Sequence, residues 1–138
     1  MTYTLASPKN HRRVDLVASL PTFLLGIETK KFTRDSREQI EDYCRHLENI
    51  AGDRPFCLVF LSPTGMEATF SDPTLSSVYK RNNQLKSWSW ETDIPKWLEG
   101  CRGICKSEKL RHFISDFRDY ISAYLSSGKY TIEDYDNQ

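Results

Sequence analysis

Two acidic residues and a lysine near the start of the chain, Asp15, Glu28 and Lys30, are of the types that phosphodiester chemistry uses. Magnesium prefers oxygen ligands and commonly takes one or two carboxylates, with water and phosphate oxygens in its other positions. Asp15 and Glu28 can supply such a pair, and the backbone carbonyl of Thr29 can add a third oxygen. Lys30 can then hold an attacking water or neutralise charge that develops on phosphorus. These residues predict a divalent-metal site with an adjacent lysine.

The same residues also allow a plainer interpretation. A Glu-x-Lys pair at the end of a strand is commonly a surface ion pair worth about 0–1 kcal/mol. Asp15 can pair with Arg12 or Arg13, which precede it directly. Because the pattern is frequent by chance, these residues alone leave the metal site and the ion pairs both open.

Two short strands are expected to carry the acidic residues. Residues 14–18 and 22–27 form short apolar runs, and the Leu20-Pro21 step between them indicates a turn. We therefore expect an antiparallel hairpin. Since side chains alternate along a strand, Glu28 and Lys30 share one face and Thr29 points to the other.

The next expected element is a helix that opens near Ser36 and stops at Gly52. Gln39 and Tyr43 are four residues apart, so they lie on one face of this helix. Ser36 with Gln39 also fits a capping box, and Tyr43 fits an ordinary core position. The pair can therefore belong to the site or to the scaffold.

In order and spacing, these segments resemble the PD-(D/E)XK nuclease superfamily, and within it the branch with a Q-x-x-x-Y motif. The matching segments are RVDL at 13–16, IETK at 27–30 and QIEDY at 39–43, with further likeness at 56–65, 86–101 and 110–121. Val14 stands where the motif has its proline. Family members usually carry a helix before the first strand, and residues 1–10 leave little room for it. The chain is then a trimmed domain, a degenerate site, or one completed by a partner chain.

The resemblance implies a role for each matching residue. Asp15 and Glu28, with Thr29, would hold Mg²⁺ or Mn²⁺, and Lys30 would be the catalytic lysine. Gln39 and Tyr43 would orient the site or contact nucleic acid.

Basic residues flank the predicted site, although the formal net charge of the chain is zero. Zero net charge argues against general binding to polyanions, but a local basic rim is what contacts to a phosphate backbone need. A solvated surface face explains the same residues equally well. The residues that we assign to nucleic-acid binding are Arg12, Arg13, Lys31, Arg34 and Arg37.

The fold class that we expect is α/β (α+β), with a restriction-endonuclease-like mixed sheet of four to five strands flanked by helices, the N-terminal helix being reduced or missing. Residues 56–61 read as a buried strand that pairs in parallel with the second strand through a crossover. Residues 66–84 read as a loop, with a candidate strand at 68–70. Residues 85–90 alternate apolar and polar residues, which indicates another strand.

Two helices are expected to follow, one capped by Thr92 and one spanning about 107–125. Both carry apolar residues at helical spacing, which we interpret as stripes that face the core rather than as a base-stacking platform. The stripes are Ile94, Trp97, Leu98 and Cys101 in the first helix, and Leu110, Phe113, Ile114, Phe117, Tyr120, Ile121 and Tyr124 in the second.

A single domain over residues 1–138, with an acidic flexible tail at 129–138, accounts for the chain. We find no membrane span or signal peptide. The four cysteines lie within helix and strand patterns and read as reduced, mostly buried thiols, which favours the cytoplasm over an oxidising compartment. Their spacing does not fit a structural zinc site.

Two functions remain. The first is a divalent-metal-dependent nuclease-like phosphodiesterase, an endonuclease or exonuclease with DNA as the leading substrate. The second is a catalytically inactive module on the same fold that binds nucleic acid or a protein partner. The presence of all five motif residues favours the enzyme, and the short N-terminus favours the module. A homodimer is one way to cut both strands or to cover the face that an absent helix leaves bare.

Overall fold

The computed structural model describes residues 2–4, 14–30, 37–68 and 70–125. They belong to two compact units, residues 1–61 with 67–87 and residues 62–66 with 88–138. Because these units are defined only by how the chain packs, they do not test the expected single nuclease-like domain, which stays a prediction. The tail at 129–138 lies outside the described residues.

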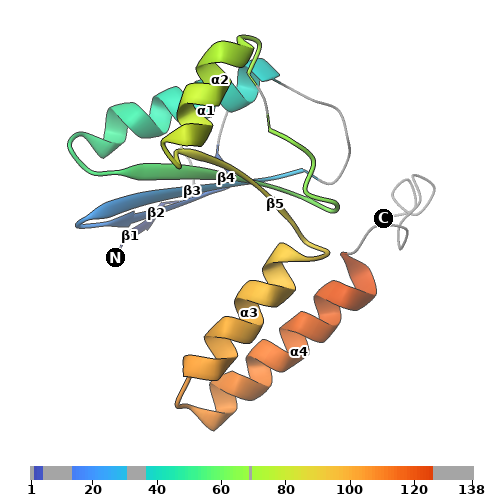
Figure 1. Cartoon of the computed structure of the whole chain (residues 1–138). Helices are drawn as coiled ribbons and strands as arrows, with labels where there is room; N and C mark the ends of the chain where they lie inside the picture. Colours follow the sequence, from blue (N-terminus) through green and yellow to red (C-terminus); the bar gives the residue numbers. More distant parts are fainter. Residues whose placement is uncertain (1, 5–13, 31–36, 69, 126–138) are drawn as a thin grey trace. The chain divides into compact units, whose positions relative to one another are not determined.

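A mixed five-stranded sheet in the order β1-β2-β3-β4-β5 organises the structure (Figure 1). Strands β1, β2 and β3 pair antiparallel, and β3 pairs with β4 in parallel. The expected hairpin and the parallel crossover are therefore confirmed, as is the α/β class. The strands are β1 Thr2–Thr4, β2 Leu16–Leu20, β3 Phe23–Thr29, β4 Phe56–Ser62 and β5 Leu85–Ser89.

Helix α1 (Arg37–Ala51) lies on one face of the sheet, as Figure 1 shows. Gly26 in β3 makes this close packing possible, because a Cβ there would lie 2.6 Å from Leu47 Cδ1 of α1. Glu28 is two residues further along β3 and therefore faces the same helix. The packing of α1 on β3 thus decides where Glu28 lies.

The core of the first unit is built from the face of α1 and the sheet residues beneath it. Helix α1 ends before Gly52, which adopts the left-handed φ of 62° that favours glycine at a helix end. The buried residues of this layer are Leu24, Ile40, Tyr43, Cys44, Leu47, Leu58 and Phe60. Tyr43 thus takes the core position that the sequence allowed.

Helix α2 (Pro73–Arg81) lies where we expected a loop, so that prediction is wrong. The side chain of Asp72 caps it by accepting hydrogen bonds from the N–H groups of Thr74 and Leu75, at 2.9 and 3.3 Å. An aspartate followed by proline is a signal for a helix start, because proline suits the first helical turn. The candidate strand at 68–70 is also wrong, since Ala68 and Phe70 lie in no strand.

Tyr79 of α2 contacts the rest of the first unit through ring packing and one hydrogen bond. Its ring lies 5.2 Å from that of Phe70 and 6.3 Å from that of Phe56, between centroids. Its hydroxyl donates to Glu48 Oε2 of α1 at 2.5 Å. Helix α2 therefore packs beside α1 on the same side of the sheet (Figure 1).

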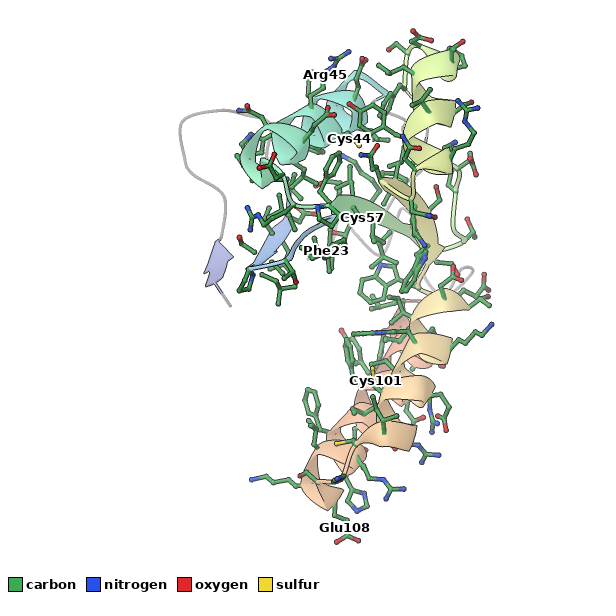
Figure 2. The ribbon with its side chains drawn as sticks, turned by 60° about the vertical axis from the view of Figure 1, so that its left-hand side comes forward. Phe23, Cys44, Arg45, Cys57, Cys101 and Glu108 are labelled. Atoms are coloured by element: carbon green, nitrogen blue, oxygen red, sulfur yellow. The ribbon has the colours of Figure 1, made fainter. Side chains whose placement is uncertain are left out.

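The second unit contains the helices α3 (Asp93–Ile104) and α4 (Glu108–Tyr124), which pack as a hairpin (Figures 1 and 2). Thr92 makes no side-chain capping bond, which corrects our expectation. Instead the Asp93 carboxylate accepts from the backbone N–H of Ser89 at 2.7 Å and from its hydroxyl at 3.2 Å.

The expected apolar stripes of α3 and α4 are only partly buried, which corrects the prediction of two core stripes. The two helices contact each other, and their buried apolar residues are Ile94, Leu98, Ile114 and Ile121. The large exposed side chains are Trp97, Ile104, Leu110, Phe113, Tyr120 and Tyr124.

Ahead of β2, the described residues contain the short strand β1 and no helix. This strand was not predicted from the sequence. Within the described ranges, no helix is long and apolar enough to cross a membrane.

The four cysteines are unpaired, and Cys44 and Cys57 are buried (Figure 2).

Candidate metal-binding site

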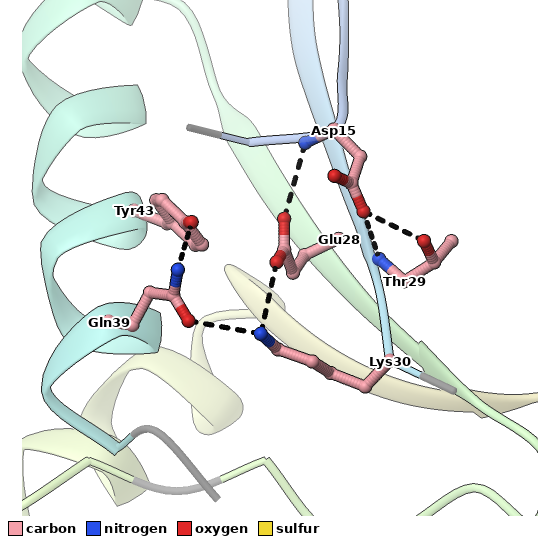
Figure 3. Close-up of polar contacts among 6 residues, drawn as sticks. All are labelled: Asp15, Glu28, Thr29, Lys30, Gln39 and Tyr43. Atoms are coloured by element: carbon pink, nitrogen blue, oxygen red, sulfur yellow. Dashed lines mark hydrogen bonds and ion pairs between the residues drawn. The ribbon is translucent and has the colours of Figure 1, made fainter. Parts of the chain in front are cut away.

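Strand pairing brings the two candidate carboxylates together at one end of the β2–β3 hairpin. Leu16 pairs with Ile27, so Asp15 and Glu28 are the next residues outward on the two strands. The backbone N–H of Asp15 donates to Glu28 Oε2 at 3.2 Å (Figure 3). An antiparallel register thus joins acidic residues that are 13 positions apart in the sequence.

Thr29 fixes the Asp15 carboxylate. Its backbone N–H and its hydroxyl both donate to Asp15 Oδ2, at 2.8 and 2.7 Å (Figure 3). Both bonds reach the same oxygen, which sets the rotamer of the carboxylate and leaves Oδ1 as the atom able to take another partner. From the sequence we expected only the carbonyl of Thr29 to take part, so this role of its side chain was not predicted.

Glu28 is a buried carboxylate, with 4% of its surface exposed. Burial and, to a smaller extent, the nearby Asp15 charge raise its pKa from 4.5 to about 7. Lys30 acts in the opposite direction, since its Nζ lies 3.6 Å from Glu28 Oε1. Lys30 therefore compensates the buried charge only in part. A bound cation would favour the ionised form.

A chain of hydrogen bonds ties Lys30 to helix α1. Lys30 Nζ donates to Gln39 Oε1 at 3.0 Å, and Gln39 Nε2 donates to Tyr43 Oη at 2.5 Å (Figure 3). Gln39 and Tyr43 lie one turn apart on the face of α1 that covers β3. Because Tyr43 occupies one end of the amide, the carbonyl end of Gln39 is turned to the ammonium group.

The structure thus brings together all the residues to which the sequence analysis gave a catalytic or metal-binding role. We refer to Asp15, Glu28, Thr29, Lys30, Gln39 and Tyr43 as the polar cluster. Ser36, the other half of the alternative capping box, lies outside the described residues, as do the alternative Asp15 partners Arg12 and Arg13.

The donor set of the polar cluster fits magnesium or manganese. Within the described part of the chain, no group of three or more His, Cys, Asp and Glu side chains is arranged to hold a metal. Two adjacent carboxylates nevertheless suffice for magnesium, which usually retains water and takes phosphate oxygens rather than a full protein cage. The burial of Glu28 beside Asp15 is the observation that supports a cation here.

The predicted nucleic-acid contacts stay predictions. Arg12, Arg13, Lys31 and Arg34 lie outside the described residues. Arg37 begins α1, but its side chain also lies outside the description.

Comparison with known proteins bears on most of the chain. A family model described as the PD-(D/E)XK nuclease superfamily matches residues 6–119, a range that contains the entire polar cluster. No curated protein and no solved structure shows a match to the chain.

Proposed function

Because the chain belongs to the PD-(D/E)XK nuclease superfamily, we propose that it is a divalent-metal-dependent nuclease that hydrolyses phosphodiester bonds in nucleic acid. The junction of Asp15, Glu28 and Lys30 carries this proposal: two adjacent carboxylates, one of them buried, lie beside an ammonium group that is held in place. DNA is the first substrate to test and RNA the second.

We assign the metal ligands to Asp15 and Glu28, with the carbonyl of Thr29 as a third oxygen. When bound, Mg²⁺ or Mn²⁺ would polarise the scissile phosphate and stabilise the leaving oxygen. Glu28 must be ionised to serve as a ligand, and its pKa of about 7 makes its protonation state sensitive to pH in the neutral range. The hydrogen bonds from Thr29 hold Asp15 in one orientation before any ligand arrives.

Lys30 acts in this proposal as a hydrogen-bond donor and as a positive charge. A lysine ammonium group has three donors and no acceptor, so it can orient an attacking water and neutralise charge on the phosphate oxygens in the transition state. Its bond to Gln39 restricts where the ammonium group can lie. Little rearrangement is then needed during the reaction.

We further propose that the protein belongs to the Q-x-x-x-Y branch of the superfamily. In support, Gln39 and Tyr43 join the polar cluster through the bond to Lys30 rather than serving the helix alone. Gln39 is a positioning residue in this account, because it acts on the reaction through Lys30. Tyr43 in turn fixes the orientation of the Gln39 amide.

One observation favours a second candidate function, a catalytically inactive module on the same fold that binds nucleic acid or a protein. Among the described residues, no third acidic side chain completes the polar cluster. A binding module could keep this scaffold without turnover.

A plasmid-nicking assay with Mg²⁺ or Mn²⁺ separates the two functions, using supercoiled DNA and, in parallel, a structured RNA. The test variant combines Asp15→Asn and Glu28→Gln, which remove both charges and keep the side-chain shapes. Asp53→Asn is the matched control, because Asp53 is an exposed acid just after α1. We expect metal-dependent cleavage by the wild type and by the control, and none by the double variant. A wild type that binds but never cleaves either substrate would establish the module instead.

A further inference from the structure

The α3–α4 hairpin has two unlike faces. On one side Arg118 Nη1 of α4 bonds to Glu99 Oε2 of α3 at 2.6 Å, and Arg102 bonds to the same glutamate at 2.7 Å. Large apolar side chains gather elsewhere on both helices and are exposed. About half or more of the surface of each of these side chains is left uncovered by the hairpin.

The exposed residues of α4 follow one another at intervals of three, four, three and four positions. They are Leu110, Phe113, Tyr120 and Tyr124, together with Phe117, which is half-buried and completes the spacing. Their rings associate along the helix, with centroids 6.3 Å apart for Phe113 and Phe117 and 4.9 Å apart for Tyr120 and Tyr124. Alternating intervals of three and four are the pattern by which a helix packs lengthwise against another helix.

Helix α3 carries the same spacing at Trp97, Gly100 and Ile104. A glycine inside a helix is destabilising by about 0.5–1 kcal/mol relative to alanine, so its presence calls for a reason. A Cβ at Gly100 would meet nothing within 4 Å, so no contact within the described residues requires a glycine there. Gly100 leaves a gap between two large side chains, which is the kind of hole that a side chain of a facing helix fills.

Helical geometry puts both exposed stripes on the same side of the hairpin. In α3, Trp97 and Ile104 lie to one side of the buried Ile94 and Leu98. In α4 the exposed stripe is displaced from its buried residues in the same rotational sense, viewed from the start of each helix. Since the two helices run in opposite directions in the hairpin (Figure 1), equal displacements bring the stripes to one side. We refer to Trp97, Gly100, Ile104, Leu110, Phe113, Phe117, Tyr120 and Tyr124 as the apolar face.

The area of the apolar face is close to what a stable interface needs. Six of its side chains are 48% to 84% exposed. Four of them are aromatic, and a large aromatic side chain buries about 150–250 Å² when fully covered, so half exposure leaves about 100 Å² each. With the exposed parts of Ile104 and Leu110, the total is about 500–600 Å². This matches the upper end of the largest apolar patch on a typical monomer, about 300–600 Å². A standard interface covers about 800 Å² per partner.

We propose that the apolar face is a homodimer interface, in which the hairpins of two copies pack as an antiparallel four-helix bundle. A two-fold axis lets one self-complementary patch serve both copies, and it closes the assembly at two. Lys109 and Asp116 are seven residues apart along the outer edge of the α4 stripe. This edge carries both signs of charge, so two copies can meet without a single-sign repulsion. The inference does not depend on nuclease activity.

The test is the mass of the full chain in solution, measured by sedimentation velocity over a wide range of concentration. The disruptive variant combines Phe113→Gln and Tyr120→Gln. Its matched control combines His112→Gln and Asp119→Gln, which lie one position earlier on the same helix with the same spacing and are exposed. We expect a concentration-dependent dimer of the 16.1 kDa chain for the wild type and the control. For the disruptive variant, we expect the dimer dissociation constant to rise at least about tenfold.

Gly100→Leu is a second variant that should weaken the dimer without unfolding the chain. Leucine favours a helix over glycine, and no described atom obstructs a side chain at this position. We expect this variant to melt at or above the temperature of the wild type while its dimer weakens, because the gap is filled. A wild type that is monomeric at every concentration overturns the proposal and leaves the face to another kind of partner. A dimer that the Phe113→Gln/Tyr120→Gln variant leaves unchanged overturns it as well.

Discussion

Folded proteins usually expose charged groups and bury large apolar ones. The polar cluster buries a charged group, whereas the apolar face exposes large apolar side chains. In the first unit the carboxylate of Glu28 is buried against helix α1, where ionisation is unfavourable. In the second unit Phe113 is 63% exposed, beside other exposed apolar side chains. Each arrangement is unfavourable for the isolated chain, because charges favour water and large apolar surfaces do not.

The difference indicates what each region requires. A buried carboxylate beside a second acidic residue is stabilised by a cation, so the polar cluster indicates a small, hard, positively charged ligand. An exposed apolar stripe with helical spacing is relieved by another helical surface, so the apolar face points to a macromolecule. The contrast breaks down if either region proves stable and inert without its partner.

Lys30→Met tests the charged region most severely. The change keeps the length of the side chain and removes its charge and its donors, so the transition state loses a preorganised partner. We expect the cleavage rate to fall about 10²–10³-fold, the usual effect of losing one such donor. Mn²⁺ binding should persist, because Lys30 is not a ligand in the proposed site. Equal loss of metal binding and cleavage would show that Lys30 holds the site together instead.

Glu28→Gln tests the burial of charge without metal or substrate. The folded-state pKa of Glu28 is about 7, above its ordinary value of 4.5. The stability associated with the protonated form is therefore present below pH 4.5 and is lost as the pH rises through 7. At about 1.4 kcal/mol per pKa unit, the metal-free wild type should lose about 3 kcal/mol relative to the variant over this range.

Urea denaturation of both proteins at a series of pH values measures this effect. The difference in unfolding free energy should change between pH 4.5 and 7 and level off above. Parallel curves for wild type and variant would mean that the pKa of Glu28 in the folded protein is close to its ordinary value. The polar cluster would then hold no unfavourable buried charge, and its contrast with the apolar face would disappear.

Thr29→Val tests whether Asp15 must be held in one orientation. Valine has nearly the same shape as threonine but lacks the hydroxyl that donates to Asp15 Oδ2. Loss of a group that orients a metal ligand commonly lowers metal affinity about 10–100-fold, and we expect the lower part of this range because the backbone donor stays. Calorimetry with Mn²⁺ measures the affinity, and Thr29→Ser should restore it. Failure of serine to do so would assign the effect to packing.

Tyr43→Phe should have a smaller effect on cleavage, about three- to tenfold, from the loss of one hydrogen bond to Gln39. The defect should lie in the cleavage rate and leave Mn²⁺ affinity within error of the wild type. A loss of metal affinity would instead mean that Tyr43 helps to hold the carboxylates in place. The chain of hydrogen bonds from Tyr43 through Gln39 to Lys30 does not indicate such a role.

The smallest expected effects are those of each region on the other. Glu28→Gln should leave the dimer dissociation constant within about twofold, and Phe113→Gln with Tyr120→Gln should leave Mn²⁺ affinity within about twofold. We expect this independence because the two regions belong to different compact units of the chain. Sedimentation and calorimetry on both variants measure this independence. A large cross-effect would show that the two regions form one functional system.

Local patterns in the sequence predict the hairpin, the parallel crossover and the common face of Glu28 and Lys30, because these depend on side-chain alternation and chain connection. The role of the Thr29 hydroxyl could not be predicted in this way. It depends on the pairing of Leu16 with Ile27, a register between separate strands. Helix α2 was missed although the Asp72-Pro73 step signals its start, because its short apolar pattern is weak.

Helical spacing correctly predicts that Phe113 and Tyr120 share one face of α4, but it does not predict what covers that face. Periodicity defines a stripe, and the core of a single chain is only one of the surfaces that can bury it. The same limit applies to Glu28. The sequence predicts its position in a strand, but its burial beneath α1 depends on the packing of Gly26 against Leu47.

Calorimetric titration of Mn²⁺ into the wild type and Glu28→Gln, at pH 6 and pH 8 in buffers of different ionisation enthalpy, tests whether Glu28 is a metal ligand. If the polar cluster is a metal site, Mn²⁺ displaces the proton of Glu28. The wild type should then release close to one proton per ion at pH 6 and almost none at pH 8, while the variant binds much more weakly and releases none. A wild type with no binding heat at either pH, or with proton release that Glu28→Gln leaves unchanged, would contradict the assignment of the metal site to Glu28.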